Sequence, residues 1–323
     1  MSVLPMIEVP RIPVGDWFES VFDWVTENFG WLFDAFSNLI DTAVEALVDV
    51  FEAPDPLLLA VIFALLGLLV RGWQFASVAL VGLVLVIGME QWVTAMETLA
   101  LVLVATVVAI IIGIPLGVLA ARSPRASSVI RPILDLMQTM PAFVWLVPVV
   151  FLFGIGYVPG VVATIIFAIA PGVRLTELGI RNVDAEVVEA AHAFGSTPRQ
   201  TLFGVQLPLA MPTIMAGVNQ VIMLALSMAV IAGLVGARGL GGEVTASIAT
   251  GNLGLAFEAG LAVVILAVYL DRVTASFGQG GILARLRRRP AEAAEEENLT
   301  DEAEHDAAGE GAEPVDMHTK IGA

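Results

Sequence analysis

The chain has 323 residues, of which 58% are hydrophobic, and its formal net charge is −17. This composition places it among membrane proteins, and the absence of cysteine excludes disulfides, thiolate metal sites and thiol nucleophiles. The acidic excess lies at the two ends, because residues 1–56 and 290–323 each hold 11 of the 32 acids. Such a distribution indicates solvated ends and argues against nucleic-acid binding.

The only lysine is Lys320, so the chain cannot build the Gly-x-x-x-x-Gly-Lys-Ser/Thr loop that holds ATP phosphates. If ATP drives the process, a partner subunit binds ATP and Mg²⁺, and no cofactor is expected in this chain. The histidines, His192, His305 and His318, lack metal-ligand spacing, so no metal site is expected. No Gly-x-Ser-x-Gly sequence supports hydrolase chemistry.

Residues 1–56 form an N-terminal acidic segment. The first residues carry several prolines and no apolar core, so they are not a signal peptide. Between Gly15 and Glu52, apolar and acidic side chains recur at helical spacing, which predicts an amphipathic helix that lies on the membrane surface or packs on the rest of the protein. Pro54-Asp-Pro56 ends it.

Residues 57–89 contain two apolar runs, 57–70 and 73–89, which Arg71-Gly72 divides. The first is short for a membrane span, which usually needs about 20 residues. The runs form either two tilted helices or a re-entrant hairpin, and both alternatives return the chain to the side on which it started.

Residues 90–277 carry five further apolar spans, so the fold class is an all-α membrane protein with about seven transmembrane helices. Prolines interrupt the second and third spans, which predicts broken helices. Gly113-x-x-x-Gly117 in the first span suits either close helix packing or a kink, and residues 236–254 read as a glycine-rich loop. The spans are Thr98–Ala120, Met137–Phe153, Val158–Val173, Thr213–Val235 and Leu255–Leu270.

Between the third and fourth spans lies a polar loop, residues 174–212. Asp184 is expected to cap a short helix, and Gly195 to end it in a left-handed conformation. Thr197 and Gln200 form a Thr-x-x-Gln capping box at the start of a second short helix, which is expected to end at Leu207-Pro208.

The amino-acid sequence of this loop resembles the EAA coupling motif of ABC importer permeases, and we therefore call residues 174–212 the coupling loop. Glu189-Ala190-Ala191 is followed by Gly195 and then by Val205-x-Leu207-Pro208, with Val205 standing where the family pattern has Ile. Neighbouring stretches at 138–143, 153–156 and 206–212 are similar to permeases of glycine betaine/proline betaine importers, over roughly residues 90 to 277.

The resemblance implies the permease subunit of a type I, binding-protein-dependent importer with a five-helix core. It implies ABC ATPase subunits docked at the coupling loop, an external substrate-binding protein, a permease homodimer with two-fold symmetry and a lipid environment. The solute would be glycine betaine or a related quaternary ammonium compatible solute, with choline, carnitine, proline and methionine as alternatives. The residues it assigns to ATPase coupling are Glu189, Ala190, Ala191, Gly195, Leu207 and Pro208.

Polar, aromatic and sulfur-containing side chains inside the spans are candidates for lining the substrate path, although helix packing explains each one equally well. Aromatic faces attract quaternary ammonium groups. The candidates are Met140, Phe143 and Trp145 in the second span and Asn219, Met223 and Ser227 in the fourth.

Placing the coupling loop in the cytoplasm puts Arg71 and the arginines of 122–131, 174–199 and 285–289 on the same side, as the positive-inside rule requires. The N-terminus is then outside and the C-terminus cytoplasmic. Residues 278–323 are expected to form a basic stop and a disordered acidic tail. A secondary transporter would need inverted repeats, and a channel would need a selectivity-filter motif. The sequence displays neither feature.

Overall fold

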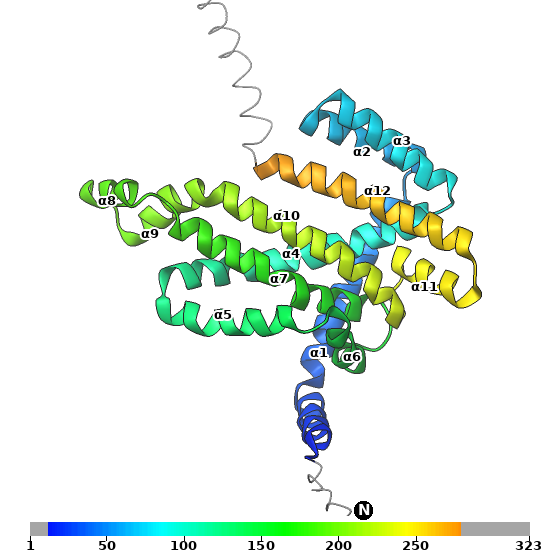
Figure 1. Ribbon diagram of the computed structural model, residues 1–323, viewed down its shortest axis with the longest axis horizontal. Helices are drawn as coiled ribbons and strands as arrows, with labels where there is room; N and C mark the ends of the chain where they lie inside the picture. The colour runs from blue at the N-terminus through cyan, green and yellow to red at the C-terminus, as the bar shows by residue number, and fades with distance from the viewer. Residues whose placement is uncertain (1–11, 279–323) are drawn as a thin grey trace, which may run out of the picture. The chain divides into compact units, whose positions relative to one another are not determined.

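The computed structural model describes residues 12–278, so the basic stop and acidic tail predicted for 278–323, and the cytoplasmic C-terminus, fall almost entirely outside the described residues. The described chain folds into α-helices joined by short connections (Figure 1). In chain order they are α1 Val14–Glu52, α2 Pro56–Arg71, α3 Trp73–Gly88, α4 Trp92–Arg122, α5 Pro124–Thr139, α6 Ala142–Phe153, α7 Tyr157–Arg181, α8 Ala185–Ala193, α9 Pro198–Thr201, α10 Leu207–Ala232, α11 Leu240–Thr250 and α12 Leu253–Gly278.

Four helical segments are long and apolar enough to cross a membrane, and six if each of two bent pairs counts as one span. The four are Trp92–Arg122, Tyr157–Arg181, Pro198–Val235 and Leu253–Ser276. The count is below the seven expected from the sequence because α2 and α3 have 16 residues each and the helices of the second span are sharply bent.

The centre of the bundle is α7, which packs between α4 and α10. Small residues allow this close approach. A Cβ atom on Gly117 would lie 2.5 Å from Cβ of Thr176, and one on Gly113 would lie 3.3 Å from the Ile169 side chain. The Gly113-x-x-x-Gly117 pair therefore packs α4 against α7, which was one of the two readings that the sequence left open.

The second span is broken, as the sequence predicted, but its first helix begins at Pro124 and not at Met137. The structure has α5 and α6, which meet at an angle of 97°. Met140 is extended because the ring of Pro141 disfavours a helical conformation in the residue before it. Trp145 Nε1 donates a hydrogen bond to the carbonyl oxygen of Met137 at 3.1 Å, which fixes the bend.

The glycine-rich segment 236–254 is not a loop, because most of it forms α11. Thr98 Oγ1 on α4 accepts a hydrogen bond from the buried N–H of Leu240 at 2.8 Å, in the first turn of α11. A Cβ atom on Gly241 would lie 2.6 Å from the carbonyl oxygen of Val230. These glycines allow α11 to approach α10 closely, so glycine content did not indicate flexibility here.

The predicted amphipathic helix is present as α1. Its second half packs on the bundle through the buried side chains of Ile40 and Val44. In the first half, Trp17, Trp24 and Trp31 are exposed by 58–70%. The second half therefore packs on the rest of the protein, which is one of the two readings left open by the sequence, and the first half presents exposed apolar side chains.

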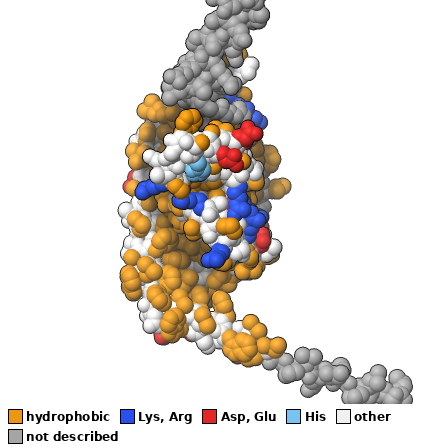
Figure 2. Space-filling view, turned by 90° about the vertical axis from the view of Figure 1, so that its left-hand side faces the viewer, with side chains coloured by type: hydrophobic (Ala, Val, Ile, Leu, Met, Phe, Trp, Pro, Cys, Tyr) orange, Lys and Arg blue, Asp and Glu red, His pale blue; other side chains and the backbone are white. Residues whose placement is uncertain are grey.

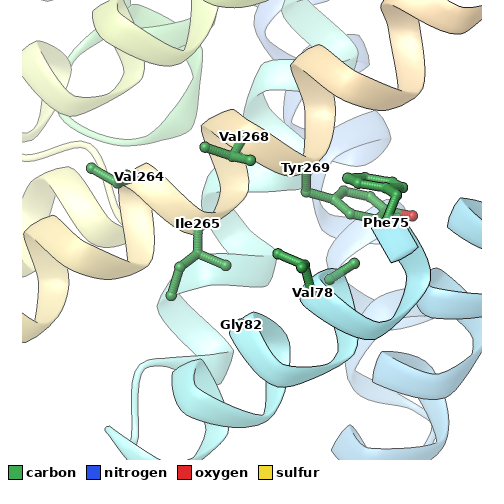
Figure 3. Close-up of a pocket in the computed structure, with 8 residues that line it drawn as sticks. Phe75, Val78, Gly82, Val264, Ile265, Val268 and Tyr269 are labelled. Atoms are coloured by element: carbon green, nitrogen blue, oxygen red, sulfur yellow. The ribbon is translucent and has the colours of Figure 1, made fainter. Parts of the chain in front are cut away.

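Helices α2 and α3 form a hairpin that turns at Gly72, whose φ of 95° favours glycine. An apolar groove of about 210 Å³ separates α3 from α12, with the rings of Phe75 and Tyr269 at one end and Gly82 opposite Ile265 (Figure 3). The side chains that line it are hydrocarbon or aromatic, and none of the predicted path residues is among them.

Candidate functional site: the coupling loop and the helices that hold it

The first short helix of the coupling loop is α8. The carboxylate of Asp184 accepts a hydrogen bond from the Glu186 N–H at 2.9 Å, which satisfies one of the free donors at the helix start. Glu189 and Ala190 are exposed, and Ala191 is half-buried. The residues that the resemblance assigns to ATPase coupling on α8 therefore remain largely available to another subunit.

Gly195 ends this helix as predicted, with a φ of +83°. Its N–H donates to the carbonyl oxygen of His192 at 2.9 Å, and the next N–H, from Ser196, donates to Ala191 at 3.0 Å. Nothing lies within 4 Å of a Cβ atom built on Gly195, so the need for glycine comes from the backbone conformation and not from crowding.

Phe194, which precedes this glycine, is 92% exposed. Helical spacing places it on the apolar face of α8 together with Val187, which is 42% exposed. The described part of the chain does not cover this face. An exposed apolar face on a protruding helix is typical of a surface that another protein covers.

The second short helix begins with the predicted capping box. The Gln200 N–H donates to Thr197 Oγ1, and Gln200 Oε1 accepts from the Thr197 N–H at 2.9 Å. The expected end at Leu207-Pro208 is wrong. A π-helical turn at Leu202–Gln206 carries the chain directly into α10, and its wider geometry accommodates Pro208, whose ring opposes an ordinary helical turn.

Arginines gather at the end of the bundle where α4 and α7 finish and the coupling loop follows. Figure 2 looks onto this end and shows basic side chains beside a smaller acidic group. The arginines of this end are Arg122, Arg125, Arg131, Arg174, Arg181 and Arg199. The sequence predicts that this end of the bundle faces the cytoplasm.

A buried carboxylate lies beneath this basic end. Glu177 of α7 is 3% exposed. Its Oε1 accepts from Ser127 Oγ at 2.8 Å and from Arg131 Nη2 at 3.0 Å, and it pairs with Arg181 Nη2 at 3.0 Å. We call these four residues the Glu177 network. Sequence reasoning missed it, because Ser127 and Arg131 lie 50 and 46 positions from Glu177.

The structure separates the predicted path residues of α10 into two groups. Asn219 faces α12, where its amide donates to Asp271 Oδ1 at 3.0 Å and its oxygen accepts from Thr274. Met223 and Ser227 lie on an exposed face of α10 together with Gln220. Asn219 therefore joins two helices, whereas Gln220 supplies the polar side chain on the open face.

Helix α6, which carries Phe143 and Trp145, packs near the same turn of α10. Leu146 and Met228, the residue after Ser227, share one buried cluster. Phe143 is 47% exposed, whereas Trp145 is half-buried and hydrogen-bonded within the α5–α6 bend, and Met140 forms the bend itself. Of these three candidates, Phe143 has the most accessible side chain.

Comparison with known proteins decides the family. Residues 113–282 match the family model "Binding-protein-dependent transport system inner membrane component", which is more than half of the chain. The chain belongs to this family. An inner membrane component with several apolar spans is a multi-pass membrane protein, and the match includes the whole coupling loop.

Three curated relatives of this inner membrane component have permease names. This chain is 55% identical over 219 residues to the glycine betaine/proline betaine transport system permease protein ProW of Escherichia coli (strain K12). The match covers 68% of this chain and 62% of ProW, so this chain spans less than two thirds of the length of that relative. It is 46% identical to the glycine betaine/carnitine transport permease protein GbuB of Listeria monocytogenes, covering 85% of this chain and 98% of GbuB. It is 47% identical to the glycine betaine transport system permease protein OpuAB of Bacillus subtilis (strain 168), and the match covers 83% of this chain and 95% of OpuAB.

The fold of this family member is also similar to a chain of the MetNI methionine ABC transporter solved in inward-facing conformations. The TM-score is 0.52 at 23% identity, over 56% of this chain and 91% of that chain. The likeness shows that the two chains share a helical fold over this part. At this identity it concerns the fold alone and not the solute.

Proposed function

We propose that this protein is the permease subunit of an ATP-driven importer of glycine betaine or related quaternary ammonium solutes. Family membership and the three relatives named for glycine betaine support the proposal. The observation that carries the ATP-driven mechanism is the protruding coupling loop, in which Glu189, the apolar face of α8 and the bend at Gly195 are exposed at one end of the bundle. A secondary transporter has no use for such a loop.

The proposed partners follow from this assignment. ABC ATPase subunits that bind ATP and Mg²⁺ dock on α8 and α9 in the cytoplasm, and an external binding protein delivers the solute. A second copy of the permease completes a two-fold assembly, in which the open face of α10 with Gln220, Met223 and Ser227 lines the path. The six coupling residues are Glu189, Ala190, Ala191, Gly195, Leu207 and Pro208.

An uncharged path fits a zwitterionic solute. Among the described residues the one buried charged side chain is Glu177, which is fully paired and lies one helical turn from the cytoplasmic end of α7. A fixed charge in the path would hold a counter-charged solute, whereas the ring of Phe143 and the sulfur of Met223 offer polarizable surfaces to a trimethylammonium group. Choline, carnitine, proline and methionine are the alternative solutes.

Co-purification tests the mechanism. The tagged permease, expressed with its neighbouring transport genes, should retain an ATPase whose turnover rises when binding protein loaded with glycine betaine is added. A permease that purifies without any ATPase, and that accumulates solute under an ion gradient alone, would show that it is a secondary transporter.

A further inference from the structure

The Glu177 network joins three helices at the base of the coupling loop. Ser127 and Arg131 reach Glu177 from α5, and Arg181 reaches it from the following turn of α7. The same Nη2 of Arg181 also donates to the carbonyl oxygen of Ala120 in the last turn of α4, at 2.9 Å. One carboxylate and one guanidinium thus hold the ends of α4, α5 and α7 together.

This arrangement is costly unless it is complete. Burying a carboxylate carries a large desolvation penalty, which only close, well-directed donors and paired charges offset. Glu177 accepts hydrogen bonds from Ser127 Oγ and from Arg131, whose Nη2 lies 3.0 Å from Oε1 and whose Nε lies 3.4 Å from Oε2, and it forms an ion pair with Arg181 at 3.0 Å. Ser127 and Arg131 both lie on α5, so separating α5 from α7 would leave the Glu177 carboxylate with Arg181 alone. Breaking a buried charge pair in this way is strongly destabilising, and we therefore expect the two helices to move together.

The helices that the network joins lead to the coupling loop and to the α5–α6 bend, the two regions that would have to move in the proposed import cycle. Arg181 ends α7 three residues before Asp184, which caps the first coupling helix. Arg131 lies on α5, which continues through the bend at Met140 into α6 and Phe143. The network and the nearby Arg174–Asp135 ion pair, which also joins α7 to α5, are therefore side-chain connections between the segment that carries the ATPase docking surface and the bent helix beside the path.

We propose that Glu177 is a positioning residue that couples displacement of the coupling loop to the α5–α6 bend, with Arg131 as the partner on α5. This rests on the proposed function. When the coupling loop moves with the ATPase, α7 moves with it, and the Glu177–Arg131 contact carries α5 and α6 along. Coupling between distant sites is transmitted through packed elements and polar networks of this kind.

The test separates coupling from structural support. Arg131 is the residue to change, because its side chain is 57% exposed and its loss leaves Arg181 on Glu177. In proteoliposomes with ATPase and binding protein, Arg131→Gln should lower the solute imported per ATP hydrolysed by about fivefold or more, within the range expected for network mutations. Binding-protein-stimulated ATP hydrolysis should stay within about twofold, since the docking surface is untouched. Arg131→Lys, which keeps the charge, should recover at least half of the coupling ratio.

The matched control is Arg125→Gln, which removes another exposed arginine of α5 that donates no side-chain bond to Glu177 and should keep the normal ratio. A parallel fall of uptake and ATP hydrolysis in Arg131→Gln, or an unchanged ratio, would overturn the proposal and leave Glu177 a structural residue. Failure of the proposed function looks different, because the unmodified complex would then import none of the solutes offered.

Discussion

Asn219 of α10 donates its side-chain amide to Asp271 of α12 at 3.0 Å, so a residue that the sequence offered as a candidate for the substrate path makes a contact between two helices. The neighbouring Gln220 is exposed on the open face of the same helix. One step along a helix rotates a side chain by about 100°, so the two polar residues point to different surroundings.

Replacement of these two residues should therefore give opposite results. Asn219→Leu removes the donor from Asp271 and should lower the free energy of unfolding by roughly 1 kcal/mol, the order found for hydrogen bonds between membrane helices. Gln220→Leu should leave thermal unfolding of the purified permease unchanged and lower the rate of uptake. An Asn219→Leu protein with unchanged stability and an altered solute preference would contradict the packing role and show that Asn219 lines the substrate path.

Gly195 should be required for coupling and not for insertion. At a φ of +83°, a β-branched side chain costs about 1–3 kcal/mol locally, so Gly195→Val should redirect α9 relative to α8. We expect normal amounts of permease in the membrane and ATP hydrolysis without uptake in proteoliposomes.

The control for this change is Gly15→Val. Gly15 on α1 is also exposed and uncrowded, but its φ is not positive and it lies outside the coupling loop, so this variant should transport normally. Normal uptake by Gly195→Val would exclude the bend as part of the mechanism.

Charge reversal on α8 should weaken ATPase binding. Glu189 is exposed in the segment assigned to docking, so Glu189→Lys places a like charge wherever the ATPase offers a cation and should speed dissociation. Surface-captured permease in detergent measures the dissociation rate directly. Glu52→Lys, at the end of α1, reverses another exposed acid and should change nothing. Equal dissociation rates for both variants and the unmodified protein would place docking elsewhere.

The orientation of the chain can be tested because it contains no cysteine. Ser20 on α1 and Ala193 on α8 are both exposed. A membrane-impermeant thiol reagent added to intact cells should label Ser20→Cys at once and Ala193→Cys only after the cells are opened. The reverse pattern would overturn the external N-terminus and the cytoplasmic coupling loop.

Local chemistry was predictable from the sequence where a residue type has one strong conformational preference. The caps at Asp184 and Thr197 and the left-handed Gly195 depend on neighbours within a few positions, and all three are present. The amphipathic α1 was also predictable from periodicity, whereas for residues 57–89 the sequence left two alternatives, two tilted helices or a re-entrant hairpin.

Errors arose where tertiary packing decided the outcome. Glycines around Gly241 were read as a loop, but they permit close contact between helices that single-sequence reasoning cannot pair. The end predicted at Leu207-Pro208 assumed that proline stops a helix, whereas a π-helical turn admits it. Glu177 was missed because nothing near it in the sequence reveals that its partners lie on α5.

The most direct test of the central claim is ATP-driven uptake of labelled glycine betaine by the reconstituted complex, with excess unlabelled choline, carnitine, proline or methionine as competitors. We expect uptake that requires ATP hydrolysis and binding protein, that unlabelled glycine betaine abolishes, and that methionine does not reduce. Robust methionine uptake without glycine betaine uptake, or accumulation of glycine betaine without ATP, would contradict the account.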